Sequence, residues 1–286
     1  MRVGTLTRPM RDTGCMSTVL TVSFDLDGVI IQNPFARGVF PWVRQHVRSN
    51  VPALAELEQA EAERQMNAAV NEIWMQRMRE GEFVTAYDWD DILNEASRRL
   101  NGPEIPSVAG LVERFSAEEG MIAVLPGATE GLQLLREHGA RIVALTNGFY
   151  KYQWPVLVAL GIEHYFDAVY TPDSIGFAKP QSGAFHAIDG LDAHIGDTLV
   201  HDVLGANLAG VTSVWMEPAL PAELAPLTPA ERAADPLLLE FLARQLEGNL
   251  YSRFHPEASI EAARPDLVVL DVHEAAQALL ERSAAD

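Results

Sequence analysis

Two aspartates stand two residues apart near the start of the chain, directly after the apolar run VLTVSF. They lie in the segment Asp25-Leu26-Asp27-Gly28. In an extended chain, residues two apart point the same way, so we expect both carboxylates to face one pocket. Gly28 then allows the backbone to turn sharply. A helix-capping or turn role is the alternative that this tetrapeptide alone leaves open.

Two further polar segments offer groups that suit a phosphate. Thr146-Asn147-Gly148 follows the apolar run RIVAL and supplies a hydroxyl, an amide and backbone N–H groups. Lys179 precedes a proline in a glycine-containing loop and supplies a compact positive charge. Taken singly, the first is also typical of a simple turn and the second of a surface lysine.

A second pair of aspartates lies in the segment GDTLVHDVLGANLAG. Asp197 ends a predicted strand, and Asp202 lies in the turn or helix start that follows. Mg²⁺ prefers hard oxygen ligands and usually takes one or two carboxylates from a protein. The pair therefore indicates a magnesium site, with a helix cap at Asp202 as the alternative.

The elements that position these residues alternate along the chain. Short β-branched runs alternate with helical stretches, which is typical of a parallel sheet covered by helices on both faces. Strands are predicted at residues 19–24, 141–145, 193–196, 211–216 and 267–270, and a helix at 132–138. Ligands bind such sheets at the carboxyl ends of the strands. The sequence thus predicts a Rossmann-like α/β fold with the polar segments at one edge.

The region between the first two strands has a different pattern. Residues 33–124 carry apolar side chains at helical spacing, which predicts a small all-helical cap domain. We interpret Trp74 and Trp89 there as cap core rather than as substrate contacts. The core is predicted at residues 18–32 and 125–286, with a helical late segment at 217–264 that serves either as an oligomer contact or as a partial cover of the cleft. Residues 1–17 are predicted to be a disordered leader, or to precede a true start at Met16.

Composition narrows the function classes. The chain has 21 Lys and Arg against 40 Asp and Glu, for a formal net charge of -19. Nucleic acid and anionic membranes are held by clustered basic residues, so neither is an expected partner. A phosphorylated substrate would need a cation, a lysine and backbone amides to reverse the field locally.

The single cysteine, Cys15, excludes an intrachain disulfide and fits a reducing cytoplasm. No signal peptide and no membrane span are expected, because no apolar run is long enough. An apolar stripe in the late segment is compatible with a homodimer. The eight histidines are scattered without metal spacing, and we interpret them as surface or satisfied core residues.

Taken together, DLDGVI, LTNG, KP and GDTLVHDVLGANLAG resemble, in this order, the four motifs of the haloacid dehalogenase superfamily. The resemblance covers residues 19–31 and 126–216, and weakly 265–280. It implies a Rossmann-like core with a helical cap inserted after the first motif. One departure is Gln181-Ser182, where the family often has an acidic residue and a second proline.

The resemblance implies chemical roles for the first motifs. Asp25 would be the nucleophile that forms an aspartyl-phosphate. Asp27 would protonate the leaving oxygen and then activate water. The phosphate would be held by three residues with neutral donors and one cation: Thr146, Asn147, Gly148 and Lys179.

The resemblance also implies a Mg²⁺ cofactor. Asp197 would bind the ion together with the Asp25 carboxylate and the Asp27 backbone carbonyl. Asp202 would fix the waters of the metal or the lysine.

The predicted function is that of a magnesium-dependent phosphatase acting on a small phosphorylated metabolite, either a sugar phosphate or a nucleotide monophosphate. The alternatives are a β-phosphoglucomutase-like mutase, a 2-haloacid dehalogenase and a scaffold without catalysis. Asp27 favours a phosphatase over a dehalogenase, because expelling an alkoxide needs an acid and expelling a halide does not. Thr146-Asn147-Gly148 looks more like the phosphatases than the mutases.

Overall fold

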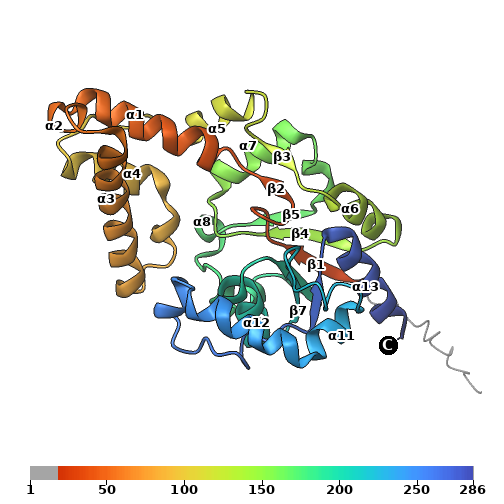
Figure 1. The fold of residues 1–286 in the computed structure, drawn as a ribbon. Coiled ribbons are helices and arrows are strands. Elements are labelled where there is room, and N and C mark those ends of the chain that lie inside the picture. The colour runs from red at the N-terminus through yellow and green to blue at the C-terminus, as the bar shows by residue number, and fades with distance from the viewer. Residues whose placement is uncertain (1–18, 286) are drawn as a thin grey trace, which may run out of the picture.

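Six parallel strands form one sheet in the order β5-β4-β1-β6-β7-β8 (Figure 1). The computed structural model describes residues 19–285, so the predicted leader at 1–17 lies outside the described residues. The strands span Thr21–Phe24 (β1), Arg141–Leu145 (β4), Ala168–Tyr170 (β5), Ala193–Gly196 (β6), Thr212–Met216 (β7) and Leu267–Val269 (β8). The predicted Rossmann-like α/β fold is confirmed.

Helices cover both faces of this sheet, because alternate residues of each strand point to opposite sides. On β4, Ile142 and Ala144 pack with α6 and α13, whereas Val143 and Leu145 pack with α9 and α10. The helices and helical turns of the core are α6 (Ala128–Glu137), α7 (Tyr150–Leu160), η3 (Glu163–Tyr165), α8 (Pro172–Ile175), α9 (Ser182–His186), η4 (Leu199–Leu204), α10 (Gly205–Ala209) and α13 (Val272–Ala285).

The strand β5 and the start of α6 differ from the sequence prediction. The strand β5 was not predicted, because it is a short edge strand whose residues are only half-buried. The helix predicted at 132–138 is α6, which begins four residues earlier, at Ala128. Gly127 precedes it with a positive φ of 77°, a conformation that glycine adopts readily.

The chain leaves the core after β1 and returns through a short antiparallel pair, β2 (Ile31–Gln32) and β3 (Ala123–Val124). Between them lies the helical region, which comprises η1 (Phe35–Val39), α1 (Phe40–Asn50), α2 (Pro52–Ala55), α3 (Gln59–Glu80), η2 (Thr85–Tyr87), α4 (Trp89–Arg99) and α5 (Val108–Ser116). Its predicted apolar stripe is largely buried, for example at Met66, Ile73 and Met78. The stripe is therefore buried, and its residues belong to the same apolar cluster as residues of β1 and β4.

The late segment, residues 217–264, lies between β7 and β8. It contains α11 (Pro229–Ala234), α12 (Pro236–Glu247) and the turn η5 (Tyr251–Arg253). The Arg232 guanidinium is buried here and donates to the carbonyls of Leu224, Ala225 and Val268 and to the Glu274 carboxylate. These bonds tie the late segment to the edge of the sheet.

Within residues 19–285, no helix combines the length and the apolar character needed to cross a bilayer. The longest of these helices, α3, has 22 residues; it buries Ala62, Met66 and Ile73 and carries charged residues such as Arg64 and Glu72.

The packing of α6 against α13 generates a stability prediction. A Cβ added at Gly131 would lie 2.5 Å from the backbone oxygen of Val272, so Gly131→Ala must push the two helices apart. We expect it to lower the free energy of unfolding by about 1–3 kcal/mol. Gly110→Ala is the matched control, because Gly110 lies on the exposed face of α5. A Cβ added there would lie 3.9 Å from its nearest neighbour, the Cβ of Ser107.

The control should stabilise the protein by about 0.5–1 kcal/mol, since alanine favours a helix more than glycine does. Urea unfolding of the two variants measures both effects. Equal effects of the same sign would contradict this account of the α6–α13 contact.

Candidate active site

The sheet topology brings three of the predicted segments together. β1 lies at the centre of the sheet between β4 and β6, and all three strands point the same way. Their carboxyl ends therefore deliver Asp25, Thr146 and Asp197 to one edge, at the point where the strand order reverses. The Asp25 N–H donates to the Ile195 carbonyl at 2.9 Å, which continues the sheet up to the site itself.

Lys179 joins this edge from the loop between α8 and α9. Its ammonium lies 3.1 Å from Asp25 Oδ1 and 2.6 Å from Asp202 Oδ1, and the lysine side chain is only 1% exposed. Burial alone would lower the pKa of Lys179, but the charges of Asp202 and Asp25 raise it above its ordinary value. Lys179 is therefore a fixed positive charge beside the Asp25 carboxylate.

Asp202 is the buried anchor of that lysine. Its carboxylate also accepts hydrogen bonds from the Thr198 backbone N–H at 2.9 Å and from the Thr198 hydroxyl, and it lies 3.0 Å from His194 Nε2. Burial raises the pKa of Asp202, but Lys179 and then His194 outweigh it and lower the pKa overall. Gly196 is required beside it, because a Cβ there would lie 2.1 Å from the Asp202 carboxyl carbon.

Asp197 approaches the first loop closely. A Cβ on Gly28 would lie 2.4 Å from Asp197 Oδ2, so the glycine leaves the space that this carboxylate occupies. The backbone oxygen of Asp197 accepts a hydrogen bond from the Trp215 indole at 2.9 Å. This hydrogen bond fixes the backbone at the end of β6, where Asp197 lies.

Three carboxylates form a cluster with the donor set that a hard cation requires. Ligand oxygens of Asp25, Asp197 and Asp202 lie within 4.8 Å of one another. Burial, opposed by Lys179 and reinforced by Asp202, raises the pKa of Asp25 to about 7. Burial, followed by the charges of Asp202 and Asp25, raises the pKa of Asp197 to about 8. These residues fit Mg²⁺, because one lysine leaves the cluster with excess negative charge that a divalent ion would neutralise.

Asp27 lines the same cavity as Asp25 and Asp197. Its carboxylate accepts hydrogen bonds from the Gln153 amide at 2.6 Å and from the Asn33 amide. Burial raises its pKa despite these two bonds. Asp27 is thus positioned by neutral donors and more easily protonated than an ordinary aspartate, which suits a general acid.

In the segment after β4, Thr146 and Gly148 differ from Asn147 in what they contact. The Thr146 hydroxyl accepts a hydrogen bond from the Gly148 N–H at 3.2 Å, and both residues line the cavity. The Asn147 amide instead donates to the Lys179 carbonyl and to the Tyr87 hydroxyl, both at 3.0 Å. Its side chain therefore connects the lysine loop to the helical region.

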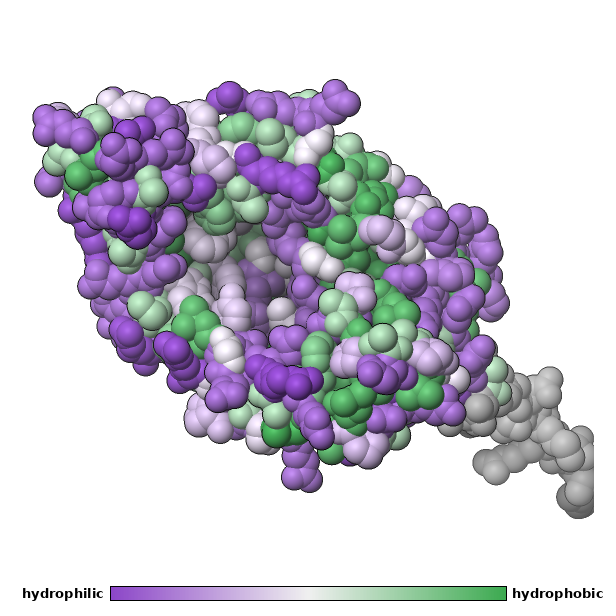
Figure 2. Space-filling model, viewed as in Figure 1, coloured by the Kyte–Doolittle hydropathy of each residue, from purple (hydrophilic) through white to green (hydrophobic). Residues whose placement is uncertain are grey.

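The cavity above these groups has a volume of about 290 Å³, and Figure 2 shows the hollow between the helical region and the core. Sequence reasoning did not find most of its walls, which come from segments without a motif. The lining residues that were not predicted are Asn33, Phe35, Phe40, Tyr87, Trp89, Tyr152, Gln153, Thr198, His201 and Tyr251.

Two of these lining residues change earlier interpretations, and a third agrees with one of the two alternatives given for the late segment. Trp89 was interpreted as cap core, yet it lines the cavity. His201 was interpreted as a surface or satisfied core residue, yet it also lines the cavity, and burial lowers its pKa to about 3, so its ring is neutral. Tyr251 shows that the late segment reaches the site. The only sequence signal for His201 was its place beside Asp202.

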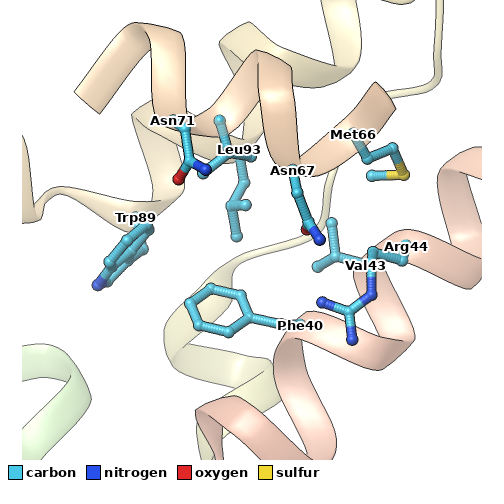
Figure 3. Close-up of a pocket in the computed structure, with 9 residues that line it drawn as sticks. Phe40, Val43, Arg44, Met66, Asn67, Asn71, Trp89 and Leu93 are labelled. Atoms are coloured by element: carbon cyan, nitrogen blue, oxygen red, sulfur yellow. The ribbon is translucent and has the colours of Figure 1, made fainter. Parts of the chain in front are cut away.

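A second cavity, of about 340 Å³, lies inside the helical region (Figure 3). Phe40 and Trp89 line both cavities and separate them. The Asn67 and Asn71 amides face this second space from α3, and Arg44 faces it from α1.

Comparison with characterised proteins points to one family. The profile of the haloacid dehalogenase-like hydrolases matches residues 19–210. The chain is 29% identical over 142 residues to a glyceraldehyde 3-phosphate phosphatase of Methanothermobacter thermautotrophicus, covering 46% of this chain and 63% of that protein. It is 34% identical over 143 residues to a phosphoserine phosphatase of Thermus thermophilus, covering 48% of this chain and 57% of that protein. The matches thus span about three fifths of each relative.

Solved structures share the fold. A HAD phosphatase from Thermococcus onnurineus superimposes with a TM-score of 0.56 at 24% identity, over 71% of this chain and 88% of that chain. The L-2-haloacid dehalogenase from Xanthobacter autotrophicus superimposes with a TM-score of 0.54 at 16% identity, over 92% of this chain and 98% of that chain. The strand-end geometry and the match over residues 19–210 agree, and the chain belongs to the haloacid dehalogenase-like hydrolase family.

Proposed function

We propose that this protein is a magnesium-dependent phosphatase that hydrolyses a small phosphate monoester through an aspartyl-phosphate on Asp25. The observation that carries the proposal is the pairing of Asp25 with a buried Lys179 at 3.1 Å, while Asp27 faces the same cavity. Phosphoryl transfer mainly needs positioning and positive charge on the phosphate oxygens, and this arrangement supplies both. The phosphatase names of the two relatives support the same reaction class.

In the proposed reaction, Asp25 attacks the phosphorus while Lys179 and Thr146 hold the phosphate oxygens. The N–H groups of Asn147 and Gly148 are further donors at this place. Asp27, protonated, gives its proton to the leaving oxygen and then takes a proton from the water that hydrolyses the aspartyl-phosphate. Gln153 and Asn33 hold the Asp27 carboxyl group in both steps.

The Mg²⁺ ion would be held by Asp25 and Asp197, with the Asp27 carbonyl as a further ligand and Asp202 beside them. When bound, it supplies positive charge that reduces the repulsion between the Asp25 carboxylate and an anionic phosphate. Asp202 also keeps Lys179 in place, as its 2.6 Å contact indicates.

We further infer that residues 33–124 act as a cap domain over a core formed by residues 18–32 and 125–286. The side chains of Phe40, Tyr87 and Trp89 support this, because they bring the helical region to the cavity above Asp25. The cap would exclude water during formation of the aspartyl-phosphate.

Replacing the nucleophile tests the proposed function directly. Asp25→Asn should reduce phosphate release from 4-nitrophenyl phosphate by on the order of 10³-fold or more, because an amide cannot form the phosphoryl ester. Asp189→Asn, at an exposed turn, is the control and should keep wild-type activity. Full phosphate release by Asp25→Asn in the presence of Mg²⁺ would end the proposal.

Replacing the general acid should give an effect that depends on the leaving group. Asp27→Asn should slow hydrolysis of an alkyl phosphate by about 10²–10⁴-fold, because an alkoxide needs a proton to leave. The loss should be much smaller with 4-nitrophenyl phosphate, whose phenolate leaves unaided. Because Asp27 also activates the water of the second step, the difference is measured as single-turnover release of the leaving group from the two esters. Equal losses in this release would show that Asp27 is not the proton donor.

The raised pKa values of Asp25 and Asp197 predict how metal-free protein responds to pH. Their pKa values rise from 3.8 to about 7 and about 8 on folding, so the folded state holds protons that the unfolded state has released. The contribution of these two groups to the free energy of unfolding should therefore be largest below about pH 4 and be lost as the pH rises through 7 and 8. In a chelator, the melting temperature at pH 8.5 should lie on the order of 5 °C below that at pH 5.5.

Mg²⁺ should reverse this loss at pH 8.5 and have little effect at pH 5.5, with NaCl of equal ionic strength as the control. Asp197→Asn should remove most of the response. An equal rise in melting temperature at both pH values would argue against binding at this cluster.

A further inference from the structure

Seven of the sixteen described residues that line the active-site cavity carry a flat ring. The helical region supplies Phe35, Phe40, Tyr87 and Trp89, and the core supplies Tyr152 and His201. Tyr251 completes the set from the late segment. Such rings bind another flat ring through offset-stacked or edge-to-face contacts.

Tyr251 is held in this position by rings on both sides. Its ring lies 4.0 Å from that of His201 and 5.4 Å from that of Trp74, both in edge-to-face geometry. Phe254 also packs edge-on against Trp74 at 5.6 Å. Figure 1 shows the loop after α12 reaching the end of the helical region, and Tyr251 of this part of the late segment lines the cavity.

The charges around the cavity disfavour an anionic leaving group. Among the lining residues in the described part of the chain, none is a lysine or an arginine, and Asp25, Asp27 and Asp197 face the same space. Lys179 contacts Asp25 and Asp202, so its charge would serve the transferred phosphate and not the leaving group. A carboxylate or a second phosphate on the leaving group would therefore meet carboxylates without a matching cation.

The cavity also presents uncharged polar groups that suit an uncharged ring on the leaving group. The Tyr87 hydroxyl lies 3.4 Å from His201 Nε2. Burial and the charge of Asp197 raise the pKa of Tyr251, so its hydroxyl stays protonated.

We propose that Tyr251, carried by the late segment, is a specificity-determining residue that selects phosphate monoesters whose leaving group contains a flat, uncharged ring, such as a nucleoside. This inference rests on the proposed phosphatase activity. It assigns residues 217–264 the role of a second cover, in addition to the helical region.

The test compares kcat/KM for uridine 5′-monophosphate and for glycerol 3-phosphate, which has no ring. Wild-type protein should prefer the nucleotide by at least about tenfold, and Tyr251→Ala should lower kcat/KM for the nucleotide by about 5- to 100-fold. Most of the loss should lie in KM, since stacking contributes equally to ground-state and transition-state binding. Turnover of glycerol 3-phosphate should change by less than about threefold, because it makes no ring contact.

Three further variants make the result specific. Tyr251→Phe keeps the ring and should retain most of the preference, whereas Tyr251→Leu keeps apolar volume without a flat ring and should lose it. Tyr251→Leu also serves if Tyr251→Ala does not fold. Leu250→Ala changes the exposed neighbour, 41% exposed, and should behave as wild type.

Equal losses for both esters in the Tyr251 variants would show that Tyr251 only supports the packing on Trp74, and would overturn the inference. So would a wild-type preference for glycerol 3-phosphate. If the wild-type protein releases phosphate from neither ester nor from 4-nitrophenyl phosphate, the proposed phosphatase function itself fails.

Discussion

The site depends on the close approach of one lysine and several carboxylates at the edge of the sheet. Lys179 lies between Asp25 and Asp202, and Asp197 is close enough to share a cation with both. In a buried position such a group of like charges is unfavourable unless positive charge balances it. Much of the surrounding structure serves to hold these groups together, including the small residues Gly28 and Gly196, which leave room for the carboxylates.

The chemistry of this edge could be predicted from the sequence because strand ends in a parallel sheet carry short local signals. Asp25 and Thr146 follow the apolar runs VLTVSF and RIVAL, and Asp197 follows the weaker strand at 193–196. Parallel pairing of β1 with β4 and β6 then places those ends side by side. The strand β5 gave no such signal, since its apolar run of three half-buried residues is too short to stand out from the surrounding sequence.

The walls of the cavity could not be predicted in this way. Tyr87, Trp89 and Tyr251 are far from the motifs in sequence, and only packing between helices brings them to the site. A helical apolar stripe looks the same whether a given ring faces its own core or a cavity, as Trp89 illustrates. The position of Tyr251 depends on the contact between η5 and Trp74 of α3, which no local pattern encodes.

The pairing of β2 with β3 has a consequence for how this architecture can vary. The chain leaves the core through β2 and returns through β3, and these two strands are paired, with Gln32 opposite Ala123 and Ile31 opposite Val124. Antiparallel neighbours can be joined by a turn of only two residues. Everything between them is therefore topologically a hairpin loop, which can be shortened, enlarged or exchanged for another module without rethreading a single strand of the central sheet.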